Sequence, residues 1–432
     1  MHTLEQLRSG ALAGIQRLSL RGLSEFPREI YALADTLEIL DLSDGALSAL
    51  PDDLPRLHKL RIVFCSQNRF TELPAVLGRC AGLSMVGFKS NRIRTVPAEA
   101  LPPQLRWLVL TDNQIAALPD ELGRRPLLQK LMLAGNRLRA LPGSMAQLHR
   151  LELLRIAANQ LDALPDWLLA LPRLSWLAYA GNPFCAGREA ALAHTPSTAI
   201  DWSALRLGGQ LGEGASGVIH RADWRRADGA ATPVAVKLFK GAMTSDGSPL
   251  SEMAACLSAG AHPHLIPVLG HVDGHPDQAH GLVMALIDPA FRNLAGPPSL
   301  ASCTRDVYED GKRCTLDAAL AIARGIASAA SQLHAHGIMH GDLYGHNILH
   351  CGQGRTLLGD FGAASCYDPA GPQAARLQAL EVRAFGCLLE ELLDRCDRPP
   401  ARLRALQAAC LQDDGAARPG FQAIKAELDK PF

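Results

Sequence analysis

His340-Gly341-Asp342-Leu343-Tyr344-Gly345-His346-Asn347 is the segment from which the architecture of the C-terminal half is predicted. Asp360-Phe361-Gly362 follows, with five residues from Asp342 to Asn347 and thirteen more to Asp360. Asn347 and Asp360 offer hard oxygen ligands of the kind that Mg²⁺ takes together with phosphates. The segment therefore predicts a site for a metal-bound phosphate, with Asp342 beside it.

Two segments upstream extend this pattern. Gly212-Glu213-Gly214-Ala215-Ser216-Gly217 stands between strand-like runs, and glycine permits a tight hairpin whose N–H groups approach phosphates closely. Val234-Ala235-Val236-Lys237 is a strand-like run that ends in a lysine, so its ammonium can reach into a cleft. Fifteen residues after Lys237, Glu252 lies in a predicted helix over residues 251–257.

In this order and spacing, the four motifs resemble the protein kinase family, whose domain is a two-lobed α+β fold. The resemblance implies that the glycine-rich loop covers the phosphates of ATP. It also implies that Lys237 contacts the α- and β-phosphates and pairs with Glu252. Asp342 becomes the base or orienter of the attacking hydroxyl, and Asn347 and Asp360 become Mg²⁺ ligands. The catalytic residues implied are thus Asp342, Lys237, Asn347 and Asp360.

The resemblance also implies the residues around the adenine ring. Ala235 is expected to line the adenine pocket, and residues 282–286 are expected to form the strand that enters the hinge, with Met284 gating the pocket. The nucleotide-binding residues implied in this way are Leu211, Gly212, Gly214, Gly217, Ile219, Ala235, Lys237, Glu252, Met284, Ala285 and Leu286.

The catalytic loop departs from the family pattern at two positions. Gly341 stands where most protein kinases have an arginine that contacts a phosphorylated activation loop, so we expect activity not to require that phosphorylation. Tyr344 stands where serine/threonine kinases have a lysine that touches the transferred phosphate, with His346 nearby as a source of partial charge. Stabilisation of the transition state by charge is therefore expected to be weaker here.

The segment after the Asp-Phe-Gly motif is also short. A buried helix of the family is matched by residues 381–386, only 21 residues after Asp360, and no Ala-Pro-Glu motif intervenes. Arg418 matches a late arginine of the family whose usual glutamate partner is absent, and Glu381 is a candidate to replace that partner.

Three functions remain open at this point. The leading interpretation is an ATP-dependent serine/threonine protein kinase that recruits its substrate through the N-terminal half. A small-molecule phosphotransferase is the second, because His-Gly-Asp also resembles aminoglycoside and choline kinases, although the intact Asp-Phe-Gly and glycine-rich loop argue against it. A catalytically weak pseudokinase scaffold, whose N-terminal half does the binding, is the third.

The N-terminal half is an array of repeats of 22 to 24 residues. Each repeat carries a strand-like pattern such as Leu105-x-x-Leu108-x-Leu110-x-x-Asn113 and ends in a Leu-Pro pair or a close relative. The phased prolines are Pro27, Pro51, Pro74, Pro97, Pro119, Pro142 and Pro165. The phased asparagines are Asn68, Asn91, Asn113, Asn136, Asn159 and Asn182, with Gly45 in the equivalent earlier position.

This pattern resembles the leucine-rich repeat family, which implies a parallel β-sheet solenoid stabilised by contacts between neighbouring repeats. The asparagine amides are predicted to form a ladder by satisfying backbone groups where the chain leaves each strand. Residues six and four positions before each asparagine are predicted to face the concave surface. The six-before row, apolar in six of its seven members, is Ile39, Ile62, Met85, Trp107, Lys130, Leu153 and Trp176.

An exposed apolar patch of this size usually marks an interaction site. We therefore expect the concave face to bind a protein or peptide, with Phe64, Trp107 and Trp176 as anchors. The alternative is that neighbouring side chains half-cover the row.

Together these patterns predict a leucine-rich repeat domain over residues 1–185, a linker over 186–203 and a protein-kinase-like domain over 204–432. The predicted fold class is an α/β leucine-rich-repeat solenoid followed by an α+β two-lobed protein-kinase-like domain. The 43 basic and 43 acidic side chains cancel, which removes any charge argument for a nucleic acid or anionic membrane partner.

We see no secretory signal and no apolar run of about 20 residues that would span a bilayer. The eleven cysteines contain no Cys-x-x-Cys pair and are interpreted as buried thiols in a reducing compartment. A cytoplasmic protein without membrane or nucleic acid partners is expected.

Overall fold

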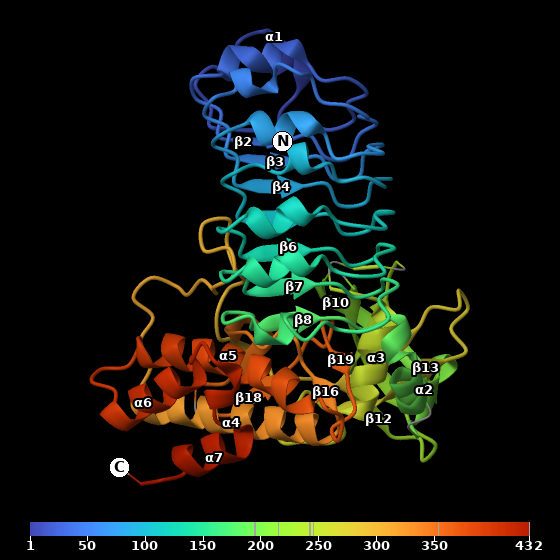
Figure 1. Cartoon of the computed structure of the whole chain (residues 1–432). Coiled ribbons are helices and arrows are strands. Elements are labelled where there is room, and N and C mark those ends of the chain that lie inside the picture. Colours follow the sequence, from blue (N-terminus) through green and yellow to red (C-terminus); the bar gives the residue numbers. More distant parts are fainter. Residues whose placement is uncertain (194–195, 215, 242, 245, 353, 432) are drawn as a thin grey trace. The chain divides into compact units, whose positions relative to one another are not determined.

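The computed structural model describes residues 1–193, 196–214, 216–241, 243–244, 246–352 and 354–431. These residues form two compact units, Met1–Arg173 and Leu174–Phe432. Both units are drawn in Figure 1. The segment predicted as a linker, residues 186–203, contains a helix and a strand of the second unit. Residues 194 and 195 of this segment, and Ala215 of the glycine-rich loop, lie outside the described residues.

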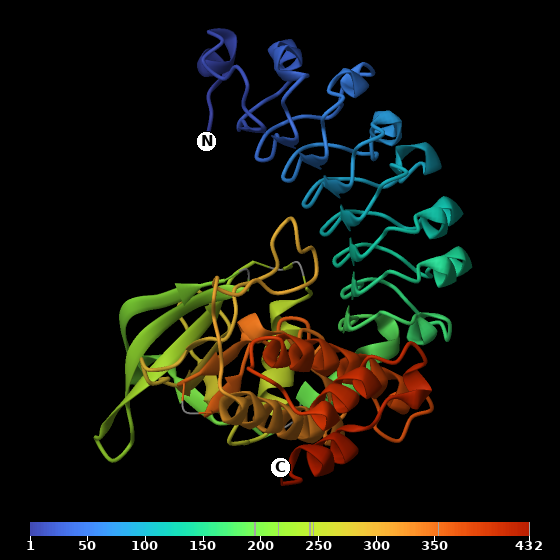
Figure 2. The same ribbon diagram turned by 90° about the vertical axis from the view of Figure 1, so that its left-hand side faces the viewer.

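The first unit is built around short parallel strands, one for each repeat. In Figure 2 the strands line the inner side of its curve and short 3₁₀ helices line the outer side. The strands are β1 (Arg17–Ser19), β2 (Ile39–Asp41), β3 (Ile62–Phe64), β4 (Met85–Gly87), β5 (Trp107–Val109), β6 (Lys130–Met132) and β7 (Leu153–Arg155); β8 (Trp176–Ala178), eighth in the strand order, belongs to the second unit. The helices are α1 (Leu4–Arg8), η1 (Arg28–Leu33), η2 (Leu54–Arg56), η3 (Ala75–Arg79), η4 (Ala98–Ala100), η5 (Asp120–Arg124), η6 (Gly143–Gln147) and η7 (Leu168–Ala170).

The middle residue of each strand points into the core, as the repeat pattern predicts. Leu40, Leu108 and Leu154 are fully buried, and the strands pair in register so that equivalent residues stack. Because each middle residue packs against its counterparts in adjacent repeats, the apolar core is continuous along the unit.

The predicted asparagine ladder is confirmed. The Asn113 Oδ1 accepts a hydrogen bond from the Ile93 N–H at 2.9 Å, and its Nδ2 donates to the Phe88 carbonyl at 2.9 Å. The same pair of bonds recurs at Asn68, Asn91, Asn136 and Asn159. Each amide therefore bonds one N–H and one carbonyl of the preceding repeat inside the turn. Some of these carbonyls, such as that of Phe88, also accept a hydrogen bond from a second asparagine.

Gly45 takes the asparagine position in the second repeat for a steric reason. A Cβ at this residue would lie 2.7 Å from the Leu23 carbonyl oxygen and 2.9 Å from the Asn68 Oδ1. Both distances are too short for a carbon contact, so this close approach of the backbone requires glycine.

The prediction that the six-before row forms an exposed apolar patch is wrong. Ile62 is 8% exposed, Met85 is 3% exposed and Trp176 is 1% exposed. Trp176 is therefore not an exposed anchor. Trp107 and Phe64 are half-buried; the Lys130 ammonium lies 4.2 Å from the centre of the Trp107 ring.

The second unit contains one sheet of six strands in the order β10-β11-β12-β14-β13-β9. Figure 2 shows this sheet on one side of the unit and the helices on the other. Its strands are β9 (Ala199–Asp201), β10 (Leu205–Glu213), β11 (Gly217–Arg225), β12 (Ala231–Phe239), β13 (Val268–Asp273) and β14 (Gly281–Ala285). Val234, Val236 and Val283 belong to one apolar cluster formed by residues of this sheet, and all three are fully buried.

The second unit also contains six α-helices, four 3₁₀ turns and five short strands among its described residues. The helices are α2 (Ala186–Ala193), α3 (Pro249–Ser258), α4 (Leu316–Ala335), α5 (Ala374–Leu393), α6 (Ala401–Cys410) and α7 (Phe421–Leu428), with 3₁₀ turns η8 (Pro183–Cys185), η9 (Trp202–Ala204), η10 (Gly345–Asn347) and η11 (Gly415–Ala417). Short strands complete the unit: β15 (Arg292–Asn293), β16 (Ile338–Met339), β17 (Ile348–His350), β18 (Thr356–Leu358) and β19 (Ser365–Cys366). Since α5 begins at Ala374, the segment between Gly362 and this helix is short, as expected.

All eleven cysteines carry free thiols, and eight of them are buried. Burial raises the pKa of the Cys80 thiol to about 11 and that of Cys366 to about 12, so both stay protonated at neutral pH. Among the described residues, none of the helices is both long enough and apolar enough to cross a bilayer.

Candidate active site

The glycine-rich segment forms the tip of the β10–β11 hairpin. The Gly214 N–H donates to the Gly217 carbonyl at 2.9 Å, which closes the turn. A Cβ at Gly217 would lie 2.4 Å from the Leu238 carbonyl oxygen on β12, so the packing of the strands requires glycine there. Gly212 and Gly214 have open space around them, which leaves room for a ligand to approach the backbone.

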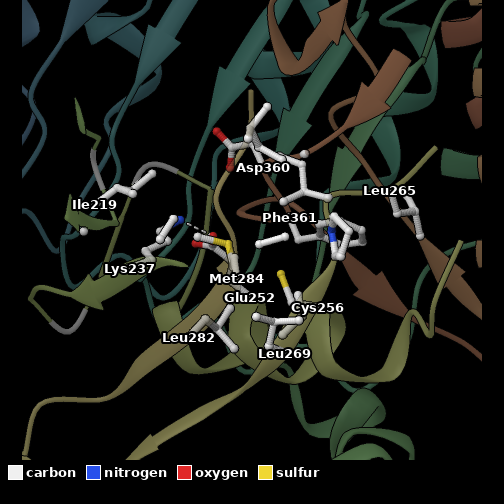
Figure 3. Close-up of a pocket in the computed structure, with 18 of the residues that line it drawn as sticks. Ile219, Lys237, Glu252, Cys256, Leu265, Leu269, Leu282, Met284, Asp360 and Phe361 are labelled. Atoms are coloured by element: carbon white, nitrogen blue, oxygen red, sulfur yellow. Dashed lines mark hydrogen bonds and ion pairs between the residues drawn. The ribbon is translucent and has the colours of Figure 1, made fainter. Parts of the chain in front are cut away.

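Lys237 on β12 forms an ion pair with Glu252 on α3, as expected (Figure 3). The side chain of Lys237 is 13% exposed and that of Glu252 is 3% exposed, so little water screens the pair. Burial raises the pKa of Glu252, the charge of Lys237 opposes that rise, and the nearby Asp360 adds to it. The pair fixes the lysine against the helix and holds its ammonium at the cleft.

A cavity of about 1110 Å³ lies beside this pair. Twelve of the fourteen predicted site residues line it; these are Leu211, Gly212, Gly214, Gly217, Ile219, Ala235, Lys237, Glu252, Met284, Ala285, Leu286 and Asp360. The Ala285 N–H donates to the Pro267 carbonyl at 2.9 Å, so this N–H is already used within the protein. A volume of this size accommodates a nucleotide.

The other two predicted residues, Asp342 and Asn347, do not line this cavity but bind each other. The Asn347 Nδ2 donates to the Asp342 Oδ2 and to the Asp342 carbonyl, both at 2.9 Å. The Asn347 Oδ1 is therefore the amide atom that remains for a cation. Asn347 sits in η10, where the Gly359 N–H donates to its carbonyl at 3.0 Å and so connects it to the Asp360 segment.

His340 supports the loop of residues 340–347 through hydrogen bonds to the backbone. It is fully buried, its Nδ1 accepts from the Asp342 N–H at 3.3 Å and its Nε2 lies 2.9 Å from the Gly359 carbonyl. Because Nδ1 accepts, Nε2 carries the proton and donates to that carbonyl. The imidazole thus joins the backbone just before Asp360 to the backbone of Asp342.

Asp360 lies at the surface of the cavity that Lys237 also lines (Figure 3). Its backbone has φ +55°, an uncommon conformation for a residue with a side chain, and its Oδ1 accepts from the Gly362 N–H at 3.2 Å. Phe361 packs beside His340, with ring centres 5.0 Å apart. An accessible carboxylate, an amide oxygen and a paired lysine are a donor set that fits Mg²⁺ with a nucleotide triphosphate.

Glu381 on α5 anchors the catalytic loop. Its Oε1 accepts from the Gly341 N–H at 2.9 Å, and its Oε2 lies 2.7 Å from the His334 Nε2. Burial alone raises the pKa of Glu381, but the hydrogen bond and charge of His334 outweigh it, so the net pKa is lowered. Since both oxygens are engaged, Glu381 does not replace the missing partner of Arg418, which donates to the carbonyls of Ala379 and Gln412 at 2.9 and 2.8 Å.

The two unusual residues of the catalytic loop have partners of their own. Tyr344 is 4% exposed and stacks on Trp176, so its ring is used in packing. His346 donates from its backbone N–H to the Asp306 Oδ2 at 3.0 Å, and its Nδ1 lies 2.7 Å from the Asp306 Oδ1. Burial lowers the pKa of His346, but the bond and charge of Asp306 outweigh it and the net pKa is raised.

Sequence reasoning missed three interactions near the site. They are the carboxylate of Asp306, the hydroxyl of Ser365 and the stacking of Trp176 on Tyr344. The only sequence signals were the departures at Gly341 and Tyr344, which indicated an altered loop without naming its partners.

Comparison with known families agrees with this architecture. Residues 205–379 match the family described as protein tyrosine and serine/threonine kinase, and residues 103–161 and 126–184 match leucine rich repeat. The fold class predicted from the sequence is confirmed: a solenoid of the leucine-rich-repeat type, with parallel strands, is followed by a protein-kinase-like domain with a mixed sheet.

Individual relatives match part of the chain. The non-receptor tyrosine-protein kinase TNK1 of Mus musculus is 29% identical over 290 residues, covering 54% of this chain and 41% of the relative. The serine/threonine-protein kinase PkaA of Streptomyces coelicolor is 31% identical over 225 residues, covering 44% of this chain and 38% of the relative. The leucine-rich repeat and calponin homology domain-containing protein 1 of Mus musculus is 31% identical over 121 residues, covering 27% of this chain and 17% of the relative. The chain thus spans less than half the length of each.

Proposed function

We propose that this chain is an ATP-dependent phosphotransferase and, more specifically, a serine/threonine protein kinase. The observation that carries the proposal is the buried Lys237–Glu252 pair beside a cavity that Asp360 also lines. The bond between Asn347 and Asp342 adds an amide oxygen and a carboxylate to this arrangement. Phosphoryl transfer needs positioning and charge neutralisation rather than covalent catalysis, so this small set of side chains is sufficient.

Each side chain has a distinct role in the proposal. Lys237 binds the α- and β-phosphates, and Glu252 keeps its ammonium directed at them. Asp342 accepts or orients the proton of the attacking hydroxyl, while the Asn347 amide holds that carboxylate in place. Asn347 Oδ1 and Asp360 would hold Mg²⁺, which when bound neutralises charge on the phosphates of ATP.

The nucleotide base would occupy the apolar end of the cavity. Leu211, Ile219 and Ala235 line this part, together with Met284 and Leu286 of the hinge. Their apolar side chains exclude water from the adenine ring, and burial of a flat ring among them favours binding.

A small-molecule phosphotransferase is the second candidate, and one observation favours it. The chain runs from Gly362 to the start of α5 at Ala374 without a further helix, so the segment that usually docks a peptide acceptor is short. Tyrosine is a further acceptor to test, since one relative is a tyrosine-protein kinase by name.

The test is transfer of radiolabelled phosphate from ATP by the purified chain, with a cell lysate as the source of acceptors. Label on serine or threonine supports the first proposal, and label on tyrosine changes its class. Label confined to small molecules supports the second candidate. Mg·ATP binding without any transfer would indicate a pseudokinase scaffold instead.

We further propose that the repeats recruit a protein or peptide through the strand face that carries Phe64 and Trp107. Both rings are half-buried, so part of each remains available to a partner. A Cβ at Gly87 would lie 2.5 Å from the Phe64 ring, so the glycine gives this ring room to lie across the neighbouring strand. A cytoplasmic location belongs to the same proposal.

A further inference from the structure

Strand β8 lies against the catalytic loop within the second unit. Trp176 at its start is 1% exposed, and its indole stacks on the Tyr344 ring with centres 4.2 Å apart and planes 9° from parallel. Its Nε1 donates to the Leu343 carbonyl at 3.2 Å. A single side chain therefore holds the two residues that directly follow Asp342, by stacking on one and by a hydrogen bond to the other.

The middle of β8 meets the same loop one residue before Asp342. Gly341 has φ +73°, and a Cβ there would lie 2.7 Å from the Leu177 carbonyl oxygen and 2.5 Å from the Ala363 carbonyl oxygen. The loop, the strand and the segment after Asp360 thus converge on one residue that has no side chain. An arginine at this position would collide with both backbones.

The end of β8 holds the segment that follows the Asp-Phe-Gly motif. The Ser365 Oγ accepts from the Tyr179 N–H at 2.9 Å and from the Ala180 N–H at 3.2 Å, and Ser365 is fully buried. Ser365 also lies in β19, which pairs with β16 immediately before the catalytic loop. The segment is therefore fixed by two elements that are themselves fixed to the loop.

Helix α2 follows β8 in the chain, after the turn η8, and packs beside α3, the helix that carries Glu252. The Ser258 hydroxyl near the end of α3 donates to the Leu192 carbonyl on α2 at 3.4 Å. Arg188 of α2 donates to the His336 carbonyl at 3.0 Å, where α4 ends ahead of the catalytic loop. Helix α2 therefore links the helix behind Lys237 to the approach of the loop.

We propose that residues 174–193, called here the β8–α2 segment, are a built-in positioning element for the transfer reaction. Strand β8 fixes the loop around Asp342 and the segment after Asp360, while α2 fixes α3 and so the Lys237–Glu252 pair. Trp176 within the segment and Ser365, which accepts from the Tyr179 and Ala180 N–H groups, are the positioning residues, and Tyr344 serves as the stacking partner of Trp176. The β8–α2 segment takes the place of a phosphorylated activation loop. This inference rests on the proposed function.

The central variant is Trp176→Ala, with Trp167→Ala as the matched control, since Trp167 is a half-buried tryptophan of the first unit outside the proposed machinery. Because the cavity residues are unchanged, we expect kcat to fall about tenfold or more while KM for ATP and the calorimetric affinity for Mg·ATP stay within about threefold. Trp176→Phe keeps a ring on Tyr344 and should recover most of the rate. The control should retain the wild-type kcat.

Hydrogen exchange of residues 341–347 provides a readout that does not depend on turnover. We expect faster exchange of these amides in Trp176→Ala and unchanged exchange in Trp167→Ala. If Trp176→Ala does not fold, Ser365→Ala replaces it, with the same expected fall in kcat and faster exchange.

A folded Trp176→Ala protein with kcat within about twofold of the wild type overturns the inference, as does an equal loss of rate in the control. If the wild type transfers no phosphate to any acceptor, the proposed function fails. In that case hydrogen exchange tests the positioning role by itself. Unchanged exchange at residues 341–347 in Trp176→Ala overturns the positioning role, and faster exchange supports it.

Discussion

The amide of Asn347 donates a hydrogen bond to the carboxylate of Asp342 across 2.9 Å. The four residues between them make one tight loop, and a second bond from the same amide nitrogen to the Asp342 carbonyl closes it. The bond orients the aspartate while leaving the amide oxygen for a cation. One side chain thus connects the proposed base to the proposed metal site.

Replacing Asp342 by Asn should abolish transfer and leave nucleotide binding largely intact. The amide cannot accept a proton, and a positioned general base contributes about a hundredfold or more to the rate. Since Asp342 does not line the nucleotide cavity, affinity for Mg·ATP should change little. Labelled-phosphate transfer and calorimetry measure the two quantities. Comparable incorporation by this variant would remove Asp342 from its assigned role.

Replacing Lys237 by Met should lower both turnover and stability. Glu252 would lose the cation that opposes the rise in its pKa, and breaking a buried pair costs about 3 kcal/mol. The double variant Lys237→Met, Glu252→Gln should regain stability without regaining activity. Urea unfolding and transfer assays distinguish the two effects; a double variant no more stable than the single one would contradict this account.

The same single variant should depend on pH in a defined direction. Without Lys237 the pKa of Glu252 in the folded state lies further above its unfolded value, so the folded state binds the proton more tightly. Its stability therefore falls as pH rises through the range between the two pKa values. Unfolding free energies measured at about pH 5 and about pH 8 should show a larger deficit at the higher pH. An equal deficit at both would argue against a buried carboxylate there.

Replacing Asn113 by Ala should destabilise the first unit. The change leaves the Ile93 N–H without its partner inside the turn, at a cost of about 2 kcal/mol, while the Phe88 carbonyl keeps its second hydrogen bond, from Asn91. Gln114→Ala, which removes an exposed hydrogen bond with Arg94, is the control and should cost less than about 0.5 kcal/mol. Urea unfolding followed by circular dichroism measures the free energy of unfolding of both variants. Equal losses of stability would show that the asparagine ladder does not stabilise the unit more than an exposed hydrogen bond does.

Replacing Gly341 by Arg should impair the protein even though it restores a residue typical of kinases. The new Cβ would collide with the Leu177 and Ala363 carbonyls, and the backbone at φ +73° disfavours any side chain. We expect a loss of at least about 2 kcal/mol in stability together with lower kcat. An active, stable Gly341→Arg protein would show that the loop has room to adapt.

The elements set by local spacing were predictable. The repeat period gave the strands, the buried middle residues and the asparagine ladder, because each repeat makes the same contacts with its neighbour. The resemblance of the motifs to the protein kinase family implied that Lys237 pairs with a glutamate of the next helix, and Glu252, fifteen residues on, was the candidate. The glycine-rich hairpin and the strand that ends at Ala285 followed from the motifs in the same way.

Other features depended on packing between segments distant in the chain. Trp107 and Trp176 hold the same position in the repeat pattern, and the sequence treats them alike. One stays half-exposed beside Lys130, while the other is buried by a loop 167 residues further along the chain. The repeat period depends on contacts between adjacent repeats, so it can be predicted from the sequence alone. Burial of a given tryptophan is determined by whichever distant surface covers it, and only the tertiary structure decides that.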